Sequence, residues 1–225
     1  MTLARALTLA LAAGRVVALR RSESSGALPP STYVITRGAL EGTVERIRGE
    51  LAAYHQRNPL RRGMSREEVR ARLGLAGRPF DEIVARAVAE GSLEGDAETL
   101  RLPDHTIRFD PEQQARVDRY LAALRARPHT PPAPVEFGLS PEEAVALGEL
   151  GEVVRLDDSI VFARSTFAEM EQQVLAYIDQ HGSITLAQFR DLFGSSRRYA
   201  QVVLESFDQR RVTRRVGDER VRYGG

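Results

Sequence analysis

The residues with the clearest chemistry are arginines near the end of the chain. Residues 190–222 contain nine arginines and five acidic residues, whereas the whole sequence has a formal net charge of only +1. A local excess of positive charge favours a site for a polyanion, and nucleic-acid phosphates are the usual ligand of such a site. Because the sequence contains no lysine, every such contact would be made by a planar guanidinium fork. The first hypothesis is therefore a nucleic-acid site within this stretch.

Two of the arginines stand at the start of a predicted helix. After a turn at Gly194, Ser195 and Ser196, apolar residues recur at intervals of three and four, which predicts an amphipathic helix with one buried stripe. The stripe consists of Ala200, Val203, Leu204 and Phe207. Either serine can cap this helix. Its free N–H groups, the positive end of its dipole and the side chains of Arg197 and Arg198 are expected to meet at one point that suits a phosphate.

An arginine-rich β-hairpin is predicted after this helix. Residues 211–215 and 219–223 have the composition of two strands, and residues 216–218 form the turn between them. Helix, turn, helix and hairpin is the order of a winged-helix module, and the arginines lie where such modules meet nucleic acid. A plainer explanation stays open. Exposed arginines often form a solvated face, and Arg210 and Arg211 could simply neutralise the end of their helix.

One pattern recurs along the chain: a helix with an apolar end, a glycine break, a short strand, a polar turn and a second short strand. The breaks are at Gly14, Gly91 and Gly151, and the terminal hairpin is the fourth copy. Recurrence at roughly 60 to 75 residues predicts a tandem array of small modules. The predicted modules are winged helices at residues 1–38 (a partial first one, with its last helix and wing), 39–108, 109–164 and 165–225, the last of which carries the arginine-rich stretch.

The predicted fold class follows from these modules. It is mainly α with small antiparallel β wings, as tandem winged-helix modules in an extended array, each with its own core. Capping boxes support the division, because a cap residue and a Glu or Gln three positions later satisfy each other's backbone donors. The predicted caps are Ser65, Ser140, Thr166 and Thr185. Asp110 precedes a proline, which favours a first helical turn. Residues 128–134 are predicted to be a stiff extended loop, and residues 20–31 to be mobile.

Composition excludes several kinds of chemistry. The absence of cysteine excludes disulfides and thiolate sites, and the absence of lysine excludes a phosphate-loop lysine and Schiff-base chemistry. No histidine has a second histidine at ligand spacing, so surface or capping roles are expected and no metal site. The histidines are His55, His105, His129 and His181. The acidic pairs at 67–68 and 157–158 are explained by a first helical turn and a polar turn, so no catalytic residue is predicted.

The sequence also bears on location. No apolar run approaches the roughly 20 residues that a membrane span needs. Residues 3–13 are similar to the apolar part of a signal peptide, but Arg5 interrupts them and a strand-like segment follows at 15–17. We therefore expect a cytoplasmic protein.

The last predicted module resembles the end of the bacterial selenocysteine-specific translation elongation factor. The resemblance is carried by residues 187–200 (AQFRDLFGSSRRYA), 204–208 (LESFD) and 212–220 (VTRRVGDER). Residues 58–64 (NPLRRGM), followed by a capped helix, resemble the second winged-helix module of that family. The resemblance covers essentially the whole chain, as the carboxy-terminal winged-helix extension of the family.

This resemblance implies a factor that delivers selenocysteyl-tRNA to a recoded UGA codon. Its last module would bind the selenocysteine insertion hairpin of the messenger RNA. The residues that match the family's RNA contacts are Arg190, Ser195, Ser196, Arg197, Arg198, Tyr199, Arg214 and Arg215. The family often has lysine at the position of Arg198, and arginine there is expected to change the local geometry.

The resemblance also implies what this chain does not do. It carries no catalytic residue, no metal and no cofactor, because GTP would bind only in the family's N-terminal half. That half's glycine loop ending in Lys-Ser/Thr is absent from this sequence, so we do not expect the chain to be an enzyme. The expected partners are the RNA hairpin and, through the parent protein, the ribosome. The chain is expected to be a monomer.

An RNA hairpin would be read where its bases can unstack, because an A-form stem hides its base edges in a deep, narrow groove. Arginines would hold phosphates, while an exposed base would stack on Tyr199 or enter a pocket between helix and wing. Two other classes stay open. A winged-helix DNA regulator would prefer duplex DNA and dimerise. A protein-interaction scaffold would keep its partner when the arginines are neutralised.

Overall fold

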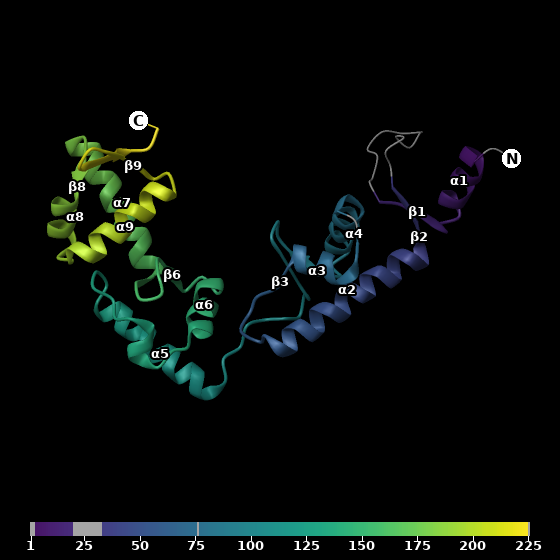
Figure 1. Cartoon of the computed structure of the whole chain (residues 1–225), viewed down its shortest axis with the longest axis horizontal. Coiled ribbons are helices and arrows are strands. Elements are labelled where there is room, and N and C mark those ends of the chain that lie inside the picture. Colours follow the sequence, from purple (N-terminus) through teal and green to yellow (C-terminus); the bar gives the residue numbers. More distant parts are fainter. Residues whose placement is uncertain (1–2, 20–32, 76, 225) are drawn as a thin grey trace. The chain divides into compact units, whose positions relative to one another are not determined.

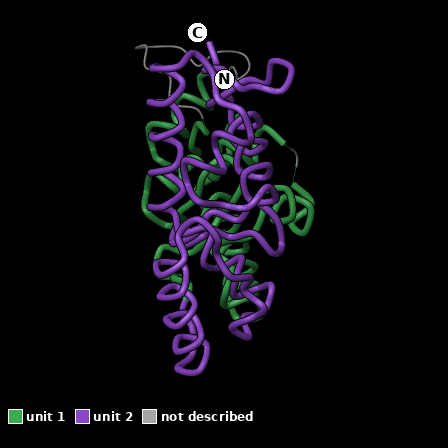
Figure 2. Tube along the Cα trace, turned by 90° about the vertical axis from the view of Figure 1, so that its left-hand side faces the viewer, with its two compact units in different colours: residues 1–107 green, residues 108–225 purple. Residues whose placement is uncertain are grey.

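The computed structural model describes residues 3–19, 33–75 and 77–224. The chain divides into two compact units, residues 1–107 and residues 108–225 (Figure 2). The segment 20–31, which the sequence predicts to be mobile, lies outside the described residues. The four module boundaries and the extended array stay predictions, because the compact units divide the chain only once.

The first unit contains two short sheets and several helices (Figure 1). In chain order its elements are α1 (Leu3–Ala12), β1 (Val16–Ala18), β2 (Val34–Thr36), α2 (Arg37–Arg57), β3 (Met64–Ser65), α3 (Arg66–Leu73), α4 (Gly77–Ala89), β4 (Glu94–Gly95) and β5 (Thr99–Arg101). Strands β1 and β2 pair antiparallel, with Val17 opposite Ile35. The second sheet has the order β3-β5-β4 and is antiparallel throughout.

The core of the first unit does not follow the predicted module boundary. Helix α2 buries one stripe, from Leu40 through Ile47 and Leu51 to His55. Val17 and Leu19 of the first hairpin belong to the same buried cluster as this stripe. The first hairpin and the second module therefore share one core, contrary to the expectation of a core for each module. The physical reason is that a two-stranded hairpin has too little apolar surface to close a core alone.

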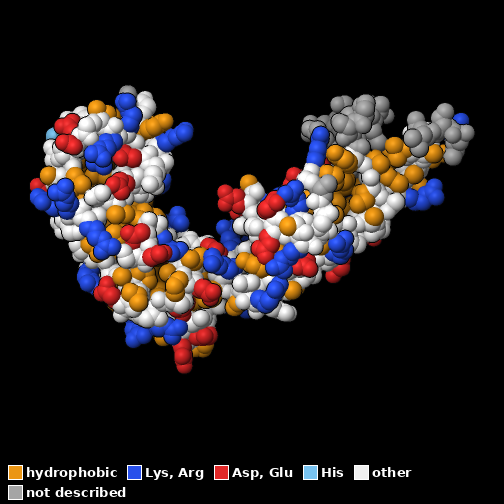
Figure 3. Space-filling view, in the orientation of Figure 1, with side chains coloured by type: hydrophobic (Ala, Val, Ile, Leu, Met, Phe, Trp, Pro, Cys, Tyr) orange, Lys and Arg blue, Asp and Glu red, His pale blue; other side chains and the backbone are white. Residues whose placement is uncertain are grey.

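Helix α1 keeps part of its apolar face in solvent. Leu9 is 53% exposed. Hydrophobic side chains gather over α1 and the β1–β2 hairpin in the space-filling view, whereas basic and acidic side chains are interspersed over the rest of that face (Figure 3).

The second unit contains the remaining elements (Figure 1). They are α5 (Pro111–Ala126), the 3₁₀ helix η1 (Pro134–Phe137), α6 (Pro141–Glu149), β6 (Val153–Arg155), β7 (Val161–Ala163), α7 (Arg164–His181), β8 (Ile184–Thr185), α8 (Leu186–Phe193), α9 (Arg197–Gln209), β9 (Thr213–Val216) and β10 (Glu219–Arg222). The last three strands form a sheet of order β8-β10-β9, and β6 pairs with β7.

Two segments of the chain have the same element order. Helix, short strand, two helices and a hairpin occur as α2-β3-α3-α4-β4-β5 and as α7-β8-α8-α9-β9-β10, and in both the short strand pairs with the last strand. This is a winged helix, so the predicted fold class is confirmed. Strands β3 and β8 were not predicted from the sequence, because a two-residue strand has no alternation of apolar and polar residues to recognise.

The predicted helix starts are mostly confirmed. Thr185, Ser140 and Asp110 form capping boxes, and the hydroxyl of Ser65 accepts the N–H of Glu68. The box predicted at Thr166 is wrong. Helix α7 begins two residues earlier, its cap residue is Ala163, and Thr166 is buried in the first turn. Strand β7 ends at Ala163 and α7 begins at the next residue, so no loop separates the strand from the helix and Thr166 does not cap the helix.

The apolar stripe of α9 is confirmed, because all four of its residues are buried. They share a cluster with Ile160 and Phe162 from the hairpin of the preceding module. Phe207 lies 5.2 Å from Phe167 between ring centroids, and Phe162 lies 6.2 Å from Phe167. The last module is therefore packed against the hairpin before it, which again crosses a predicted module boundary.

The proline-rich loop is more buried than its composition suggests. Pro131, Pro132 and Pro134 are buried. Residues 128–130 form a turn and a bend, and Pro134 begins η1, so the predicted extended loop is reduced to residues 131–133. Proline has no N–H to satisfy, which lowers the cost of burying this backbone.

The structure brings two histidines together that the sequence analysis treated as scattered. The rings of His55 and His105 stack at 3.5 Å between centroids, 10° from parallel. The N–H of Leu102 donates to Nε2 of His55 at 3.3 Å, and Nε2 of His105 lies 2.8 Å from the carbonyl oxygen of Arg61. Within the described ranges, no three metal-binding side chains cluster. In the same ranges, no helix combines the length and apolar character needed to cross a membrane.

Candidate nucleic-acid interface

A groove lies between helices α8 and α9 and the β9–β10 wing of the last module. It has a volume of about 490 Å³. Its lining comes from the start of α8, the outer face of α9 and the β9–β10 hairpin: Thr185, Leu186, Ala187, Arg197, Gln201, Glu205, Arg215, Asp218 and Arg220. Three arginines from separate elements therefore face one space.

Arg220 forms the most rigid part of this groove. It is only 4% exposed, and its Nε lies 3.4 Å from Oδ2 of Asp208. The hydroxyl of Thr213 donates to the other oxygen of Asp208 at 2.6 Å. A buried guanidinium needs a carboxylate partner, and here the partner is itself held by a hydrogen bond. Arg220 is thus a fixed donor group, which the sequence analysis placed in the arginine-rich hairpin but not among the site residues.

Arg197 and Arg215 lie at the exposed edge of the groove. Arg197 is exposed and makes no ion pair with any residue that the structure describes. The Nε of Arg215 donates to the carbonyl oxygen of Gly217 at 2.9 Å, and its Nη2 lies 3.8 Å from Asp218. Such exposed pairs contribute little energy, so both guanidinium groups are accessible to a ligand.

The start of α8 faces the groove, whereas of the first turn of α9 Arg197 alone is among its lining residues. Leu186 and Ala187 are in the first turn of α8, where backbone N–H groups have no helical partner, and the positive end of the helix dipole lies there. The capping box of Thr185 and Gln188 satisfies only the N–H groups of these two residues. The groove thus combines a helix start with arginines, which is the chemistry of an anion site.

Three of the predicted site residues lie instead where α9 meets the preceding module. The hydroxyl of Ser195 donates to the carbonyl oxygen of His129 at 2.7 Å, and the hydroxyl of Tyr199 donates to that of Pro131 at 2.9 Å. Arg198 donates to the hydroxyl of Ser159 at 2.6 Å. The expectation that Arg197, Arg198 and the start of α9 meet at one point is therefore wrong. Consecutive helix residues point about 100° apart, and the preceding module occupies the second direction.

The remaining three predicted residues are separate from the groove lining. Ser196 is the cap of α9, and its hydroxyl accepts the N–H of Tyr199 at 3.4 Å. Arg190 forms an ion pair with the adjacent Asp191 at 2.9 Å. Arg214 is exposed on β9, where successive side chains point to opposite faces, so it does not join Arg215 in the groove. That these residues bind RNA stays a prediction.

The fold and this groove define a class of protein: a tandem winged-helix protein with a basic groove at the last wing. The family described as "Elongation factor SelB, winged helix" matches residues 176–222 and, in a second family model of the same description, residues 48–102. Two segments of the chain are therefore similar to the winged helices of elongation factor SelB. The matched segments lie within the two regions of identical element order.

Two curated relatives are similar to the chain in sequence. The chain is 28% identical over 180 residues to a selenocysteine-specific elongation factor of Desulfomicrobium baculatum, covering 76% of this chain and 28% of that protein. It is 25% identical over 185 residues to the selenocysteine-specific elongation factor of Escherichia coli (strain K12), covering 77% of this chain and 30% of that protein. The chain therefore spans less than a third of the length of the curated relatives it matches.

Two solved structures are similar. The mRNA-binding domain of elongation factor SelB from E. coli, in complex with SECIS RNA, matches with a TM-score of 0.40 and 22% identity, covering 51% of this chain and 99% of that one. The bacterial selenocysteine-specific elongation factor EF-Sec matches with a TM-score of 0.44 and 14% identity, covering 90% of this chain and 32% of that one.

Proposed function

We propose that the chain is the RNA-binding region of a selenocysteine-specific elongation factor, and that its last winged helix binds the selenocysteine insertion hairpin of a messenger RNA. One observation carries the proposal. The residues that line the groove with Arg197, Arg215 and Arg220 all lie within residues 176–222, the segment that matches the SelB winged-helix family.

The groove suits a nucleotide that has left its stack. A-form stems hide their base edges, so a protein reads an RNA hairpin at its loop or at a bulge. Arg197 and Arg215, at the exposed edge, would hold phosphates near the start of α8. Arg220, fixed by Asp208, would donate to a base edge, and Gln201 offers both a donor and an acceptor beside it. Phosphate contacts and base contacts would thus come from different arginines.

Other features of the proposal concern the whole factor. The chain itself would perform no catalysis and need no cofactor. GTP and the aminoacyl-tRNA would bind in the part of the relatives' length that this chain does not match. The RNA-binding region would act as a monomer in the cytoplasm and would reach the ribosome as part of the longer factor.

The test measures binding by fluorescence anisotropy as a function of salt. The probes are an insertion hairpin, the same hairpin with a mutated loop, and duplex DNA with the stem sequence. We expect the hairpin to bind best and its loop mutant more weakly. Arg197→Ala should weaken hairpin binding and make the slope of log K against log salt shallower by about one, because one phosphate contact is lost.

The matched control is Arg119→Ala. Arg119 lies on α5, and its Nε donates to the carbonyl oxygen of Ala115 one turn earlier on the same helix at 3.3 Å. It should leave both affinity and slope unchanged. If Arg197→Ala binds the hairpin like the parent at every salt concentration, or if duplex DNA binds as well as the hairpin, the proposal is wrong.

A further inference from the structure

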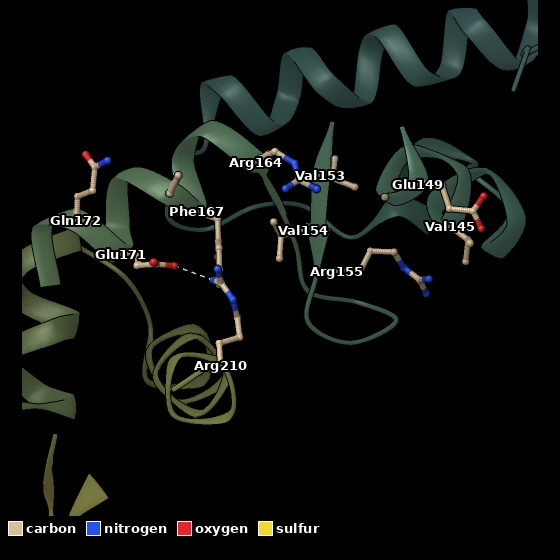
Figure 4. Close-up of a pocket in the computed structure, with 12 residues that line it drawn as sticks. Val145, Glu149, Val153, Val154, Arg155, Arg164, Phe167, Glu171, Gln172 and Arg210 are labelled. Carbon is tan, nitrogen blue, oxygen red and sulfur yellow. Dashed lines mark hydrogen bonds and ion pairs between the residues drawn. The ribbon is translucent and has the colours of Figure 1, made fainter. Parts of the chain in front are cut away.

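A second groove lies in the second unit, beyond the other end of α9 (Figure 4). It has a volume of about 580 Å³ and lies between α6 and β6 on one side and α7 on the other. Its apolar lining consists of Val145, Val153, Val154, Phe167 and Ala168. A space of this size accommodates a small ligand or one unit of a polymer.

Three arginines from three separate elements line this groove. Arg155 ends β6, Arg164 begins α7, and Arg210 follows α9. In Figure 4 the side chain of Arg210 extends to Phe167 and Glu171, and that of Arg164 extends towards Val153. Because residues 155, 164 and 210 are far apart in the sequence, only the packing of the two modules brings these cations together.

Arg210 presents a fixed planar surface. Its Nη1 donates to Glu171 at 2.8 Å, and its guanidinium carbon lies 5.3 Å from the ring centroid of Phe167. The side chain is nevertheless 49% exposed. A guanidinium held by a carboxylate and by an aromatic ring, with half of its side chain exposed, offers a planar group on which a nucleobase can stack.

The other two arginines have unused donors. The Nε of Arg164 donates to the carbonyl oxygen of Gly151 at 2.6 Å, and its terminal amino groups make no further bond to any residue that the structure describes. Arg155 donates through Nη2 to Asp158 at 3.2 Å, while its buried Nε has no partner in the described part of the chain. A buried donor without a partner carries a desolvation cost that a bound anion would remove.

We propose that this groove binds one nucleotide of a single-stranded RNA segment. The base stacks on the plane of Arg210 over the apolar lining, and the phosphates accept from Arg164 and Arg155. This second RNA contact goes beyond the hairpin site and does not depend on it.

The test uses the whole chain and a fluorescently labelled single-stranded hexa-adenylate, with binding measured by anisotropy at low salt. We expect Arg164→Gln and Arg155→Gln each to weaken binding about tenfold, since each removes a phosphate contact in a site with a single stacked base. Arg119→Gln should leave binding unchanged. Two variants are used because one of them could weaken binding simply by destabilising the fold. A variant with a lower melting temperature than the parent is therefore set aside, and the other decides the result.

Several outcomes would overturn the inference. If Arg197→Gln but neither groove variant weakens binding, the strand occupies the groove at the wing. If the oligonucleotide does not bind, the groove is not an RNA site, and binding of an acidic decapeptide that depends on Arg164 would make it a protein-docking site. The hairpin site is tested separately with an insertion hairpin that has no single-stranded tail. Binding of that probe should depend on Arg197 and not on Arg164.

Discussion

Arg197 and Arg220 line the same groove but differ in what holds them. Arg220 is buried against Asp208, so its direction is fixed before any ligand arrives. Arg197 is exposed and keeps its rotamer freedom. A fixed donor can discriminate between bases because it cannot move to suit the wrong one, whereas a mobile cation suits any phosphate. The two residues therefore suit different roles in one site.

The stacked histidines give the first unit a dependence on pH. Burial, together with the nearby charges of His105 and Arg101, lowers the pKa of His55 from 6.5 to about 4. In the unfolded chain this imidazole takes up a proton near pH 6.5, whereas in the folded chain it does so only near pH 4. The unfolded state therefore binds more protons between these values, and the free energy of unfolding should fall as pH falls from 6.5 to 4. The loss should be at most about 3 kcal/mol.

The measurement is the free energy of unfolding of the first unit, taken from its transition in urea at several pH values between 6.5 and 4. In His55→Gln the part of the loss that comes from His55 should disappear. His181→Gln is the control, because His181 is exposed and lies in the second unit. A parent protein whose first transition is equally stable at pH 7 and pH 4.5 would contradict this account of His55.

At the scale of elements, the two winged helices have the same order, but their wings differ in the sign of their charge. In the first unit the wing carries Glu94, Asp96 and Glu98, and Arg78 at the start of α4 lies 3.9 Å from Glu82. In the last module the corresponding elements carry Arg197, Arg215 and Arg220, described above. An acidic wing repels phosphate. The fold is therefore shared, and the charge on its wing indicates which copy binds RNA.

The wing of the first unit depends on a glycine. A Cβ atom at Gly95 would lie well inside 3.0 Å of both the carbonyl oxygen of Thr99 and the side chain of Leu100. We expect Gly95→Ala to destabilise the first unit by about 1–3 kcal/mol, because the backbone of β5 must move to admit the methyl group. Thermal melting measures the change.

The matched control lies on α2. Gly49 has open space around its Cβ position and a helical conformation. Gly49→Ala should stabilise the same unit by roughly 0.5–1 kcal/mol, since alanine loses less conformational entropy in a helix. Opposite signs for the two substitutions are the expected result. Equal effects would show that the close approach at Gly95 is relieved without cost.

At the scale of the whole molecule, the chain has two compact units and, among the described residues, three buried clusters. The second and third clusters both lie within residues 108–225, and the hairpin β6–β7 contributes to each of them through Val161 and Phe162. The third and fourth predicted modules are therefore linked through one hairpin. We expect them to unfold together.

Phe207→Ala tests this link. Phe207 is fully buried in the cluster that includes Phe162 and Phe167, so its truncation should destabilise the second unit by roughly 3–5 kcal/mol. Calorimetry of the whole chain should show two transitions, of which only the one from residues 108–225 moves to lower temperature. If residues 109–164 keep their own transition at the parent temperature, the two modules are independent. If the variant melts like the parent, Phe207 is not a core residue.

The sequence by itself determined what depends on neighbours along the chain. The buried stripe of α9, the caps at Ser140 and Thr185 and the arginine-rich hairpin all follow from periodicity and from hydrogen bonds within a few residues. Only the tertiary structure decided what depends on distant segments. Tyr199 donates to the carbonyl oxygen of Pro131, and Arg198 donates to the hydroxyl of Ser159, so neither side chain lies in the groove that Arg197 lines.

The same reason explains the other features that the sequence did not reveal. His55 and His105 are 50 positions apart, and the three arginines of the second groove come from three elements. Periodicity places a side chain on a face of its own helix or strand, but the face that it meets is chosen by the burial of the whole core. Which arginines share a groove is therefore a property of the packed units, whereas the presence of arginines at those positions is a property of the sequence.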